Sequence, residues 1–254
     1  MSIICKFCRP FASLVHYRLS GLLKWQRNLT ASRYFHILTN EFRFTLTKMN
    51  KSEKFWDKSA SKFDQEGKKD EQTYIKIIER TKKYLKISDT VLDFGCGTGL
   101  ISNEIADNVK LIHAIDISSK MIEIAKNKAD NRKIQNIDYT HSTIFDERYK
   151  SGSFDVILAF YILHLLKDNQ KTIQRINDLL KPGGLVISVI PCIGEKIFLN
   201  ISLSLLSKIG LVPDIKSFKA NELEDLIANA NFQTIENESL HQGIPQYFIV
   251  AKKI

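Results

Sequence analysis

The stretch VLDFGCGTGL, residues 91–100, places an acidic residue and three glycines at the end of an apolar run. Gly95, Gly97 and Gly99 allow positive φ and leave no Cβ in the way of an approaching ligand. The dinucleotide-binding pattern G-x-G-x-x-G/A would require a small residue at position 100, where this chain has Leu100. The loop therefore predicts a ligand site other than a standard dinucleotide site, the alternative being a tight turn that binds nothing.

Two carboxylates flank this loop in the sequence. Asp93 comes two residues before Gly95, where its charge would repel a phosphate but suit an ammonium or sulfonium group. Asp116 ends the next apolar run, where it can accept hydrogen bonds from both hydroxyls of a ribose. NAD-binding proteins also use an acid at that place, so Asp116 alone does not choose between ligands. Together the two acids favour a glycosylated ligand that has a positively charged tail.

Short apolar runs alternate with amphipathic stretches around these residues, which predicts a parallel sheet covered on both faces by helices. Strands are expected at 90–94, 110–115, 137–140, 154–160, 185–190, 234–240 and 247–251. Helices are expected at 51–64, 70–86, 118–129, 169–180 and 220–230, and one shortly after the glycines. Ser118 is a plausible N-cap. The expected fold is α/β, Rossmann-like and doubly wound, with a mostly parallel seven-stranded sheet in a single domain.

Four segments together resemble successive motifs of the class I S-adenosylmethionine-dependent methyltransferases. They are VLDFGCGTGL, AIDIS at 114–118, SFDVILAFYILH at 153–164 and LLKPGGLVIS at 179–188. FWDKSASKFD at 55–64 also resembles the aromatic-rich opening of the small-molecule branch near the ubiquinone and menaquinone biosynthesis methyltransferases. The resemblance covers nearly all of residues 49–254 and implies S-adenosyl-L-methionine as the cofactor.

The resemblance also implies roles for particular residues. The glycines would turn against the methionine part of the cofactor, Cys96 contributing only backbone, while Asp93 holds the loop or the cofactor's amino group. Asp116 would bind the ribose, and Ile117 and Met121 would pack on the adenine, although a buried Met is as often plain core. The implied cofactor-binding set is Asp93, Gly95, Cys96, Gly97, Gly99, Asp116, Ile117, Met121, Thr143 and Phe160.

Two of those implied contacts are less direct than the others. Ser142 or Thr143 would meet the adenine edge, but the family commonly has an acid nearby and this chain has THSTIF, with Asp146 several residues later. The backbone carbonyls of Ala159 and Phe160 would face the methionine ammonium. The ring of Phe160 or of Tyr161 would face the sulfonium, unless it packs in the core.

His164 follows the fourth expected strand and is the candidate catalytic residue, a general base for an acceptor that must lose a proton. The alternative is a buried neutral or helix-capping histidine. No Ser-His-Asp set, HExxH pair or P-loop is present in the sequence. Cys5 and Cys8 form a single C-x-x-C pair without further ligands at zinc-finger spacing, so no metal site is expected.

The first 48 residues differ in composition from the rest. They hold eight of the Lys and Arg residues and one acid, which is +7 of the formal net charge of +9 and leaves +2 for residues 49–254. A nearly neutral body makes a nucleic-acid partner unexpected. The basic amphipathic segment resembles a mitochondrial transit peptide, with an interface helix or an overlong start at Met49 as alternatives. We expect a cytoplasmic protein, or one of the mitochondrial matrix if this segment is a transit peptide.

Residues 192–217 contain the apolar run KIFLNISLSLLSKIGLV, at a place where the family that the chain resembles often builds a lid over its substrate. The resemblance thus implies a lid over a small apolar or amphipathic methyl acceptor, the equal alternative being a helix that extends the core. No apolar run in the sequence reaches the roughly eighteen residues of a membrane span. The expected function is methyl transfer from S-adenosylmethionine to such a small molecule. Two alternatives remain open: a catalytically inactive assembly or interaction module that keeps the cofactor fold, and an NAD-dependent oxidoreductase, which Leu100 and Asp93 disfavour.

Overall fold

The computed structural model describes residues 51–65, 67, 70–192, 215–218, 220–240 and 246–254. The predictions for residues 1–48 and for the apolar run at 196–212 therefore lie outside the described residues. Among the helices that are described, none is long and apolar enough to cross a membrane.

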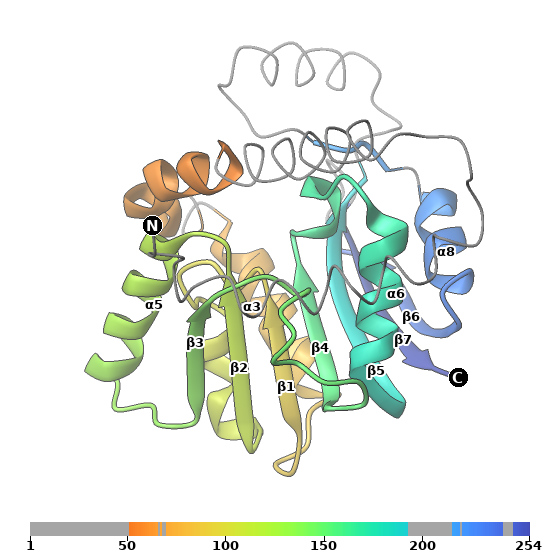
Figure 1. Ribbon diagram of the computed structural model, residues 1–254, viewed down its shortest axis with the longest axis horizontal. Helices are drawn as coiled ribbons and strands as arrows, with labels where there is room; N and C mark the ends of the chain where they lie inside the picture. Colours follow the sequence, from red (N-terminus) through yellow and green to blue (C-terminus); the bar gives the residue numbers. More distant parts are fainter. Residues whose placement is uncertain (1–50, 66, 68–69, 193–214, 219, 241–245) are drawn as a thin grey trace, which may run out of the picture. The chain divides into compact units, whose positions relative to one another are not determined.

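A seven-stranded sheet of order β3-β2-β1-β4-β5-β7-β6 forms the centre of the fold (Figure 1). The strands are β1 Thr90–Phe94, β2 Leu111–Asp116, β3 Ile137–His141, β4 Phe154–Phe160, β5 Leu180–Pro191, β6 Phe232–Ser239 and β7 Gln246–Lys253. β1 to β5 pair in parallel, and β7 runs antiparallel between β5 and β6. The expected mostly parallel sheet is confirmed, and β4 has the predicted bounds.

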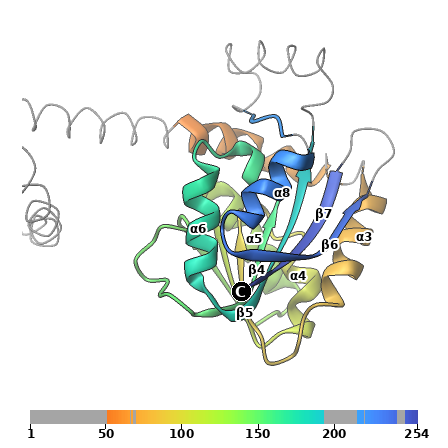
Figure 2. The same cartoon turned by 90° about the vertical axis from the view of Figure 1, so that its right-hand side faces the viewer.

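Helices cover both faces of the sheet (Figure 2). One face packs against α3 Glu71–Lys82, α4 Ser102–Ile105 and α5 Ser119–Asn131, through buried side chains such as Ile77, Ile105 and Ala125. The other face packs against α6 Asn169–Leu179 and α8 Ala220–Ala228, through side chains such as Ile176 and Ile227. Apolar residues on one stripe of each helix are buried in this way, which is the expected amphipathic pattern.

Three details differ from the expected elements. α3 ends at Lys82, four residues before the predicted end, and a short turn then leads to β1. The helix after the glycines has only four residues and continues as the 3-10 turn η1, Ala106–Asn108. β5 begins at Leu180, five residues before the predicted start of that strand. The strand order reverses between β1 and β4, so a ligand is expected at the carboxyl ends of these strands.

Candidate cofactor and acceptor site

The glycine loop follows β1 directly and has positive φ at all three glycines, 78° at Gly95, 55° at Gly97 and 75° at Gly99. The N–H groups of Gly95 and Cys96 both donate to the carbonyl of Ile115 in β2, at 2.8 and 3.0 Å. The turn is therefore fixed to the neighbouring strand, and residues with a side chain would be strained at each glycine.

The space beside each glycine differs. A Cβ on Gly95 would lie 3.0 Å from the side chain of Ile162, and one on Gly97 would lie 3.3 Å from Phe63. A Cβ on Gly99 would lie only 2.3 Å from the hydroxyl oxygen of Tyr139. Gly99 is thus required by packing against β3 inside the fold, which differs from the expected ligand approach.

Asp116, at the end of β2, joins the glycine loop to the start of α5. Its carboxylate accepts the N–H of Gly97 at 3.0 Å and the N–H of Ser118 at 2.8 Å. Burial raises the pKa of Asp116 above its ordinary value, although these two hydrogen bonds act in the opposite direction. The predicted ribose-binding acid therefore also organises the loop, a second role that its place in the sequence did not indicate.

Asp93 lies at 3% exposure and accepts a short hydrogen bond from the hydroxyl of Ser102 in α4. Burial and the nearby charge of Asp116 raise its pKa to about 7, while the Ser102 hydrogen bond lowers it. The sequence suggests a permanently charged carboxylate at this place, whereas the side chain is close to half protonated at neutral pH. The reason is that no described basic side chain contacts it, so burial disfavours the anion.

The remaining residues predicted around the cofactor lie close to these acids. Cys96 is half-buried, and burial together with Asp93 and Asp116 raises the pKa of its thiol well above the ordinary value, so the thiol stays protonated. Ile117 is half-buried, and Met121 is 1% exposed at the start of α5. The side chain of Met121 is therefore inside the fold, as the core interpretation expects.

The acid that the family commonly has near the adenine stretch is missing from THSTIF itself, but Asp146, several residues later, folds back toward it. Asp146 lies four residues beyond Ser142 in sequence, and the loop returns so that the hydroxyl of Ser142 donates to Asp146 at 2.7 Å. The Arg148 guanidinium also donates to both carboxylate oxygens of Asp146 and holds its pKa far below the ordinary range. Thr143 stands half-buried in the same turn. This acid is thus present but already paired with Arg148.

Two neighbouring aromatic residues at the end of β4, Phe160 and Tyr161, have different surroundings. Phe160 is 7% exposed and packs in the core with Val189 and Phe248. Tyr161 has a φ of 53°, and its hydroxyl donates to Gln246 in β7 at 2.8 Å. A tyrosine in the left-handed region is strained, and such strain is concentrated at functional sites. Because the Phe160 ring is buried in the core, this residue would contact a ligand through its backbone carbonyl.

The connection from β4 to α6 contains buried polar atoms without partners. His164, in the 3-10 turn η2 Leu163–Leu165, is 8% exposed, and its Nδ1 has no hydrogen-bond partner among the described residues. Burial lowers the pKa of His164 to about 4, so its imidazole is neutral at pH 7. Asn169, the first residue of α6, is 2% exposed, and neither of its side-chain amide atoms has a partner within the part of the chain that the structure describes. The sequence does not single out Asn169, because an asparagine at a helix start is common.

A helix at 51–65 lies against the glycine loop and the start of α5 (orange in Figure 1). Asp64 accepts a hydrogen bond from Thr98 of the loop at 2.5 Å, and Asp57 accepts one from Ser118 at 2.6 Å. The sequence predicts this helix but not its contacts with the loop. The available signal was the placement of acids at 53, 57 and 64 on one helical face.

The fold therefore gathers Asp93, the glycine loop, Asp116 and Thr143 at the adjoining carboxyl ends of β1, β2 and β3. His164 lies past the carboxyl end of β4, on the same edge of the sheet. Among the described parts of the chain, no group of three or more potential metal ligands occurs. The structure thus assembles the predicted positions on one edge, although their contacts with a ligand remain predictions.

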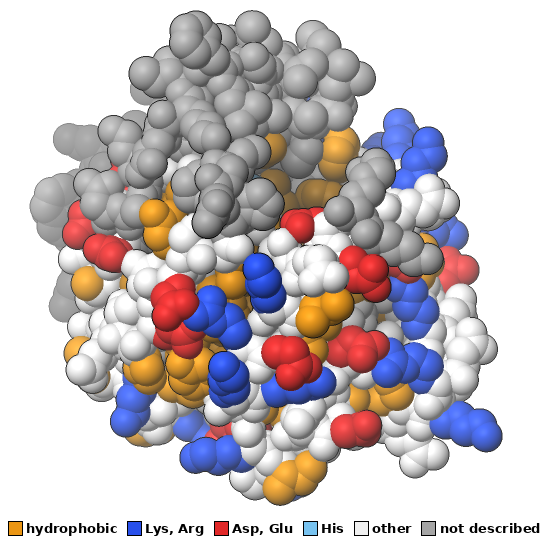
Figure 3. Space-filling model, turned by 180° about the vertical axis from the view of Figure 1, so that it is seen from behind, with side chains coloured by type: hydrophobic (Ala, Val, Ile, Leu, Met, Phe, Trp, Pro, Cys, Tyr) orange, Lys and Arg blue, Asp and Glu red, His pale blue; other side chains and the backbone are white. Residues whose placement is uncertain are grey.

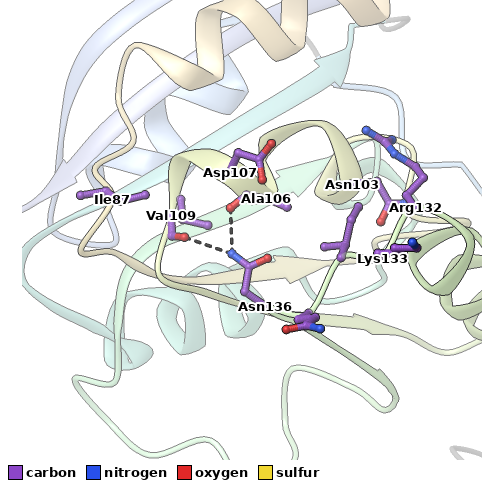
Figure 4. Close-up of a pocket in the computed structure, with 10 residues that line it drawn as sticks. Ile87, Asn103, Ala106, Asp107, Val109, Arg132, Lys133 and Asn136 are labelled. Carbon is purple, nitrogen blue, oxygen red and sulfur yellow. Dashed lines mark hydrogen bonds between the residues drawn. The ribbon is translucent and has the colours of Figure 1, made fainter.

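The opposite edge of the sheet has a hollow of about 480 Å³ (Figure 4). It lies at the amino ends of the strands and is lined by residues such as Ile87, Arg132 and Asn136. The amide of Asn136 already donates to the carbonyls of Ala106 and Val109, at 2.8 and 3.1 Å. Because ligands of such sheets bind at the carboxyl ends, this hollow is not the candidate site.

Acidic and basic side chains are interspersed on the face seen from behind (Figure 3). Close pairs of opposite charge include Arg80 of α3 with Glu236 of β6, at 3.0 Å, and Lys82 with Glu79, both of α3, at 3.3 Å. A nucleic-acid-binding face would instead gather Lys and Arg on one surface. This face therefore has no such basic patch among its described residues.

The strand order, the glycine loop after β1 and the acid at the end of β2 define the Rossmann-like class of S-adenosylmethionine-dependent methyltransferases. The chain belongs to the family described as methyltransferase domain, whose sequence profile matches residues 85–238. A 94-residue segment is 35% identical to the ubiquinone biosynthesis O-methyltransferase of Coxiella burnetii. That match spans 37% of this chain and 40% of the relative, so well under half of each protein is aligned.

Solved structures have the same fold at low sequence identity. An S-adenosylmethionine-dependent methyltransferase from Methanosarcina mazei is 21% identical, with a TM-score of 0.57, covering 68% of this chain and 95% of that one. The geranyl diphosphate C-methyltransferase of Streptomyces coelicolor, in complex with S-adenosyl-L-homocysteine, is 12% identical, with a TM-score of 0.57. The aligned part covers 67% of this chain and 74% of that one.

S-adenosylmethionine is the cofactor of this family, and the residues at the edge of the sheet fit it. Asp93 and Asp116 are buried acids whose pKa values are raised by burial, and a cationic ligand would stabilise their charged forms. Gly95 and Gly97 have positive φ, which gives the tight turn between the two acids. These are the chemical features required by a ligand with a ribose and a positive charge.

Proposed function

We propose that this protein transfers a methyl group from S-adenosylmethionine to a small apolar or amphipathic acceptor. The observation that carries the proposal is the glycine loop held between Asp93 and Asp116, in a chain of the methyltransferase family. When bound, the cofactor supplies a methyl group on a good leaving group, so the protein has mainly to orient the acceptor and exclude water.

The donor would be held by residues at the ends of β1 and β2. Asp116 binds the ribose hydroxyls through the carboxylate lone pairs that the N–H groups of Gly97 and Ser118 do not use. Asp93 faces the positive charge of the cofactor. Gly95, Cys96, Gly97 and Gly99 provide the turn, while Ile117 and Thr143 lie beside the adenine. The buried side chain of Met121 supports them from the core. Phe160 contributes its backbone carbonyl, since its ring is in the core.

The acceptor would lie past the end of β4. The unpartnered Nδ1 of His164 and the two unpartnered amide atoms of Asn169 support this, because buried polar atoms nearly always have partners. Together they provide both a donor and an acceptor, which suits an uncharged polar group such as a hydroxyl on an otherwise apolar molecule. Because His164 is neutral, it can accept a hydrogen bond from that group throughout the neutral pH range, while the burial that lowers its pKa also makes it a weak base.

The test is incubation of the purified chain with methyl-labelled S-adenosylmethionine and a fractionated cell extract. We expect label in lipid-soluble small molecules. Label in protein or nucleic acid would contradict the acceptor class, while binding of the cofactor without transfer to any fraction would favour an inactive interaction module. Calorimetry that detects NAD but no S-adenosylmethionine would instead indicate an oxidoreductase.

A further inference from the structure

The 51–65 helix carries charges of opposite sign on its two faces. One face carries four lysines spaced at three to four residues, all of them exposed: Lys51, Lys54, Lys58 and Lys62. Acidic residues at 53, 57 and 64 are half-buried on the other face, and the buried Ala60 lies between them. Acidic side chains turned toward a protein surface require partners there. Those partners therefore indicate what this helix recognises.

Asp64 contacts both the glycine loop and α5. Its Oδ1 accepts the hydroxyl of Thr98 at 2.5 Å, and its Oδ2 lies 2.5 Å from Nζ of Lys128. Lys128 also donates to the carbonyl of Thr98 at 3.1 Å. Asp64, Thr98 and Lys128 thus each contact the other two. The loop residue among them, Thr98, is fully buried.

The other two acids contact the ends of the next strands. Asp57 accepts the hydroxyl of Ser118 at 2.6 Å and the N–H of Lys120 at 3.2 Å, at the start of α5, where the helix dipole favours a negative charge. Glu53 lies 3.4 Å from Nε2 of His141, which in turn lies 2.9 Å from the carbonyl of Ile117. The three acids therefore follow the edge formed by the glycine loop, the end of β2 and the end of β3.

Aromatic side chains of the same helix complete the contact. The ring of Phe63 faces Gly97, where a Cβ would approach it to 3.3 Å. Trp56 packs edge-on against Phe63, with ring centroids 6.4 Å apart. The helix therefore places aromatic rings next to the glycine loop, and the hydrogen bonds of its acidic residues hold it in this position.

We propose that Asp57 and Asp64 are positioning residues that latch the 51–65 helix over the donor-binding loop, so that the donor is released only when this latch opens. The proposal rests on the proposed function for the identity of the ligand. The latch would exclude water from the loop side of the site and would set the rate of cofactor exchange. Asp64 is the principal contact, because it alone joins the helix to both the loop and α5.

The experiment measures the dissociation rate of S-adenosylhomocysteine by stopped-flow fluorescence. A Trp25→Phe background leaves Trp56, on the latched helix, as the reporter. We expect Asp64→Asn and Lys128→Met each to raise the dissociation rate about tenfold, and the double variant to add little, because both remove one shared interaction. Asp64→Glu, which keeps the charge, should recover much of the slow rate.

The matched control is Glu104→Gln, which removes an exposed ion pair with Arg132 away from the 51–65 helix. It should leave the dissociation rate unchanged, while its melting temperature changes no more than that of Asp64→Asn. Equal rates in Asp64→Asn and the parent, or equal acceleration in the control, would overturn the latch.

Hydrogen exchange of the ligand-free protein separates this proposal from the proposed function. Asp64→Asn should accelerate exchange at amides of residues 51–65 and leave β1 and β4 protected. If S-adenosylhomocysteine does not bind at all, the proposed function is wrong, and selective acceleration in the helix would still support the latch. Uniform or unchanged exchange would overturn the latch whatever the ligand.

Discussion

The two ends of the candidate site lie on the same edge of the sheet but differ in how their polar groups are satisfied. At the donor end, Asp93, Asp116 and Asp64 all accept hydrogen bonds from the protein itself. At the acceptor end, His164 Nδ1 and both amide atoms of Asn169 are buried and have no partner in the described ranges of the chain. A donor site complete in its internal bonding suits a ligand common to a whole family. Polar atoms left without partners suit a ligand whose own polar group would complete their hydrogen bonds.

The largest effect is expected at Asp116, which serves both the donor and the loop. Asp116→Ala removes the acceptor of the Gly97 and Ser118 N–H groups, each a charge-assisted hydrogen bond. We expect the affinity for S-adenosylmethionine, measured by calorimetry, to fall by about 100-fold or more. Asp107→Ala, at an exposed acid in η1, is the control and should bind normally. Undiminished affinity in Asp116→Ala would remove the donor end from this place.

Gly99 tests whether the loop is held by internal packing. Gly99→Ala would have to accommodate a Cβ 2.3 Å from the Tyr139 hydroxyl at a φ of 75°, and we expect unfolding free energy to fall by about 3 kcal/mol. Gly152→Ala has a similar φ of 66° but no atom within 4 Å, and should cost about 1 kcal/mol. Denaturant unfolding of both variants measures the difference. Equal losses would mean that backbone strain alone requires a glycine at 99.

The donor end was largely predictable from the sequence because its features are local. The alternation of apolar runs predicts strands, and the glycines and the acids lie within a few residues of strand ends, so Asp93, Gly95 and Asp116 meet once the strands pair. The same reasoning places β4 at its observed bounds. Periodicity is reliable here because a parallel strand buried on both faces has a nearly continuous apolar sequence.

The features that escaped prediction depend on contacts between distant segments. Gly99 is required by Tyr139, forty residues later, and Asp146 reaches Ser142 only because the 142–149 loop folds back. The contacts of Asp64 depend on where the 51–65 helix docks. The missing partners of Asn169 are a property of its surroundings in the folded state, which no local pattern encodes. His164 lies where the sequence suggests, and its catalytic role remains a prediction.

Asp93 should make donor binding depend on pH. Its raised pKa of about 7 means that a cationic donor, which favours the charged form, must displace a proton at lower pH. Affinity should therefore fall below pH 7, by at most about tenfold per pH unit, and be flat above it. For the free protein the sign is opposite, because a raised acid pKa costs stability as pH rises from about 4 to 7.

Calorimetry from pH 5.5 to 8.5 in buffers of different ionisation enthalpy would measure both the affinity and the proton released. Asp93→Asn, which keeps the size of the side chain, should remove the dependence below pH 7. A pH dependence that persists unchanged in this variant would assign the titration to another group, with Asp116 as the nearest, since its pKa is also raised by burial.

The smallest effect, at Asn169, most directly tests the difference between the two ends. Leucine has nearly the same size and no polar atoms, so Asn169→Leu removes buried groups that the free protein leaves unsatisfied. We expect stability to rise by about 1 kcal/mol, or the melting temperature by about 2–4 °C. Cofactor affinity should stay unchanged while methyl transfer to the lipid-soluble fraction declines.

Asn177 on the same helix provides the matched control for that gain in stability. It is also buried, but its amide donates to the carbonyls of Ala230 and Asn231, at 2.9 and 3.3 Å. Asn177→Leu should therefore lower the melting temperature, because two carbonyls lose their donor. If Asn169→Leu also lowered it, or raised it with transfer intact, Asn169 would be an ordinary structural residue. A more stable protein that transfers less would mean that the fold tolerates an unsatisfied amide for the sake of the acceptor.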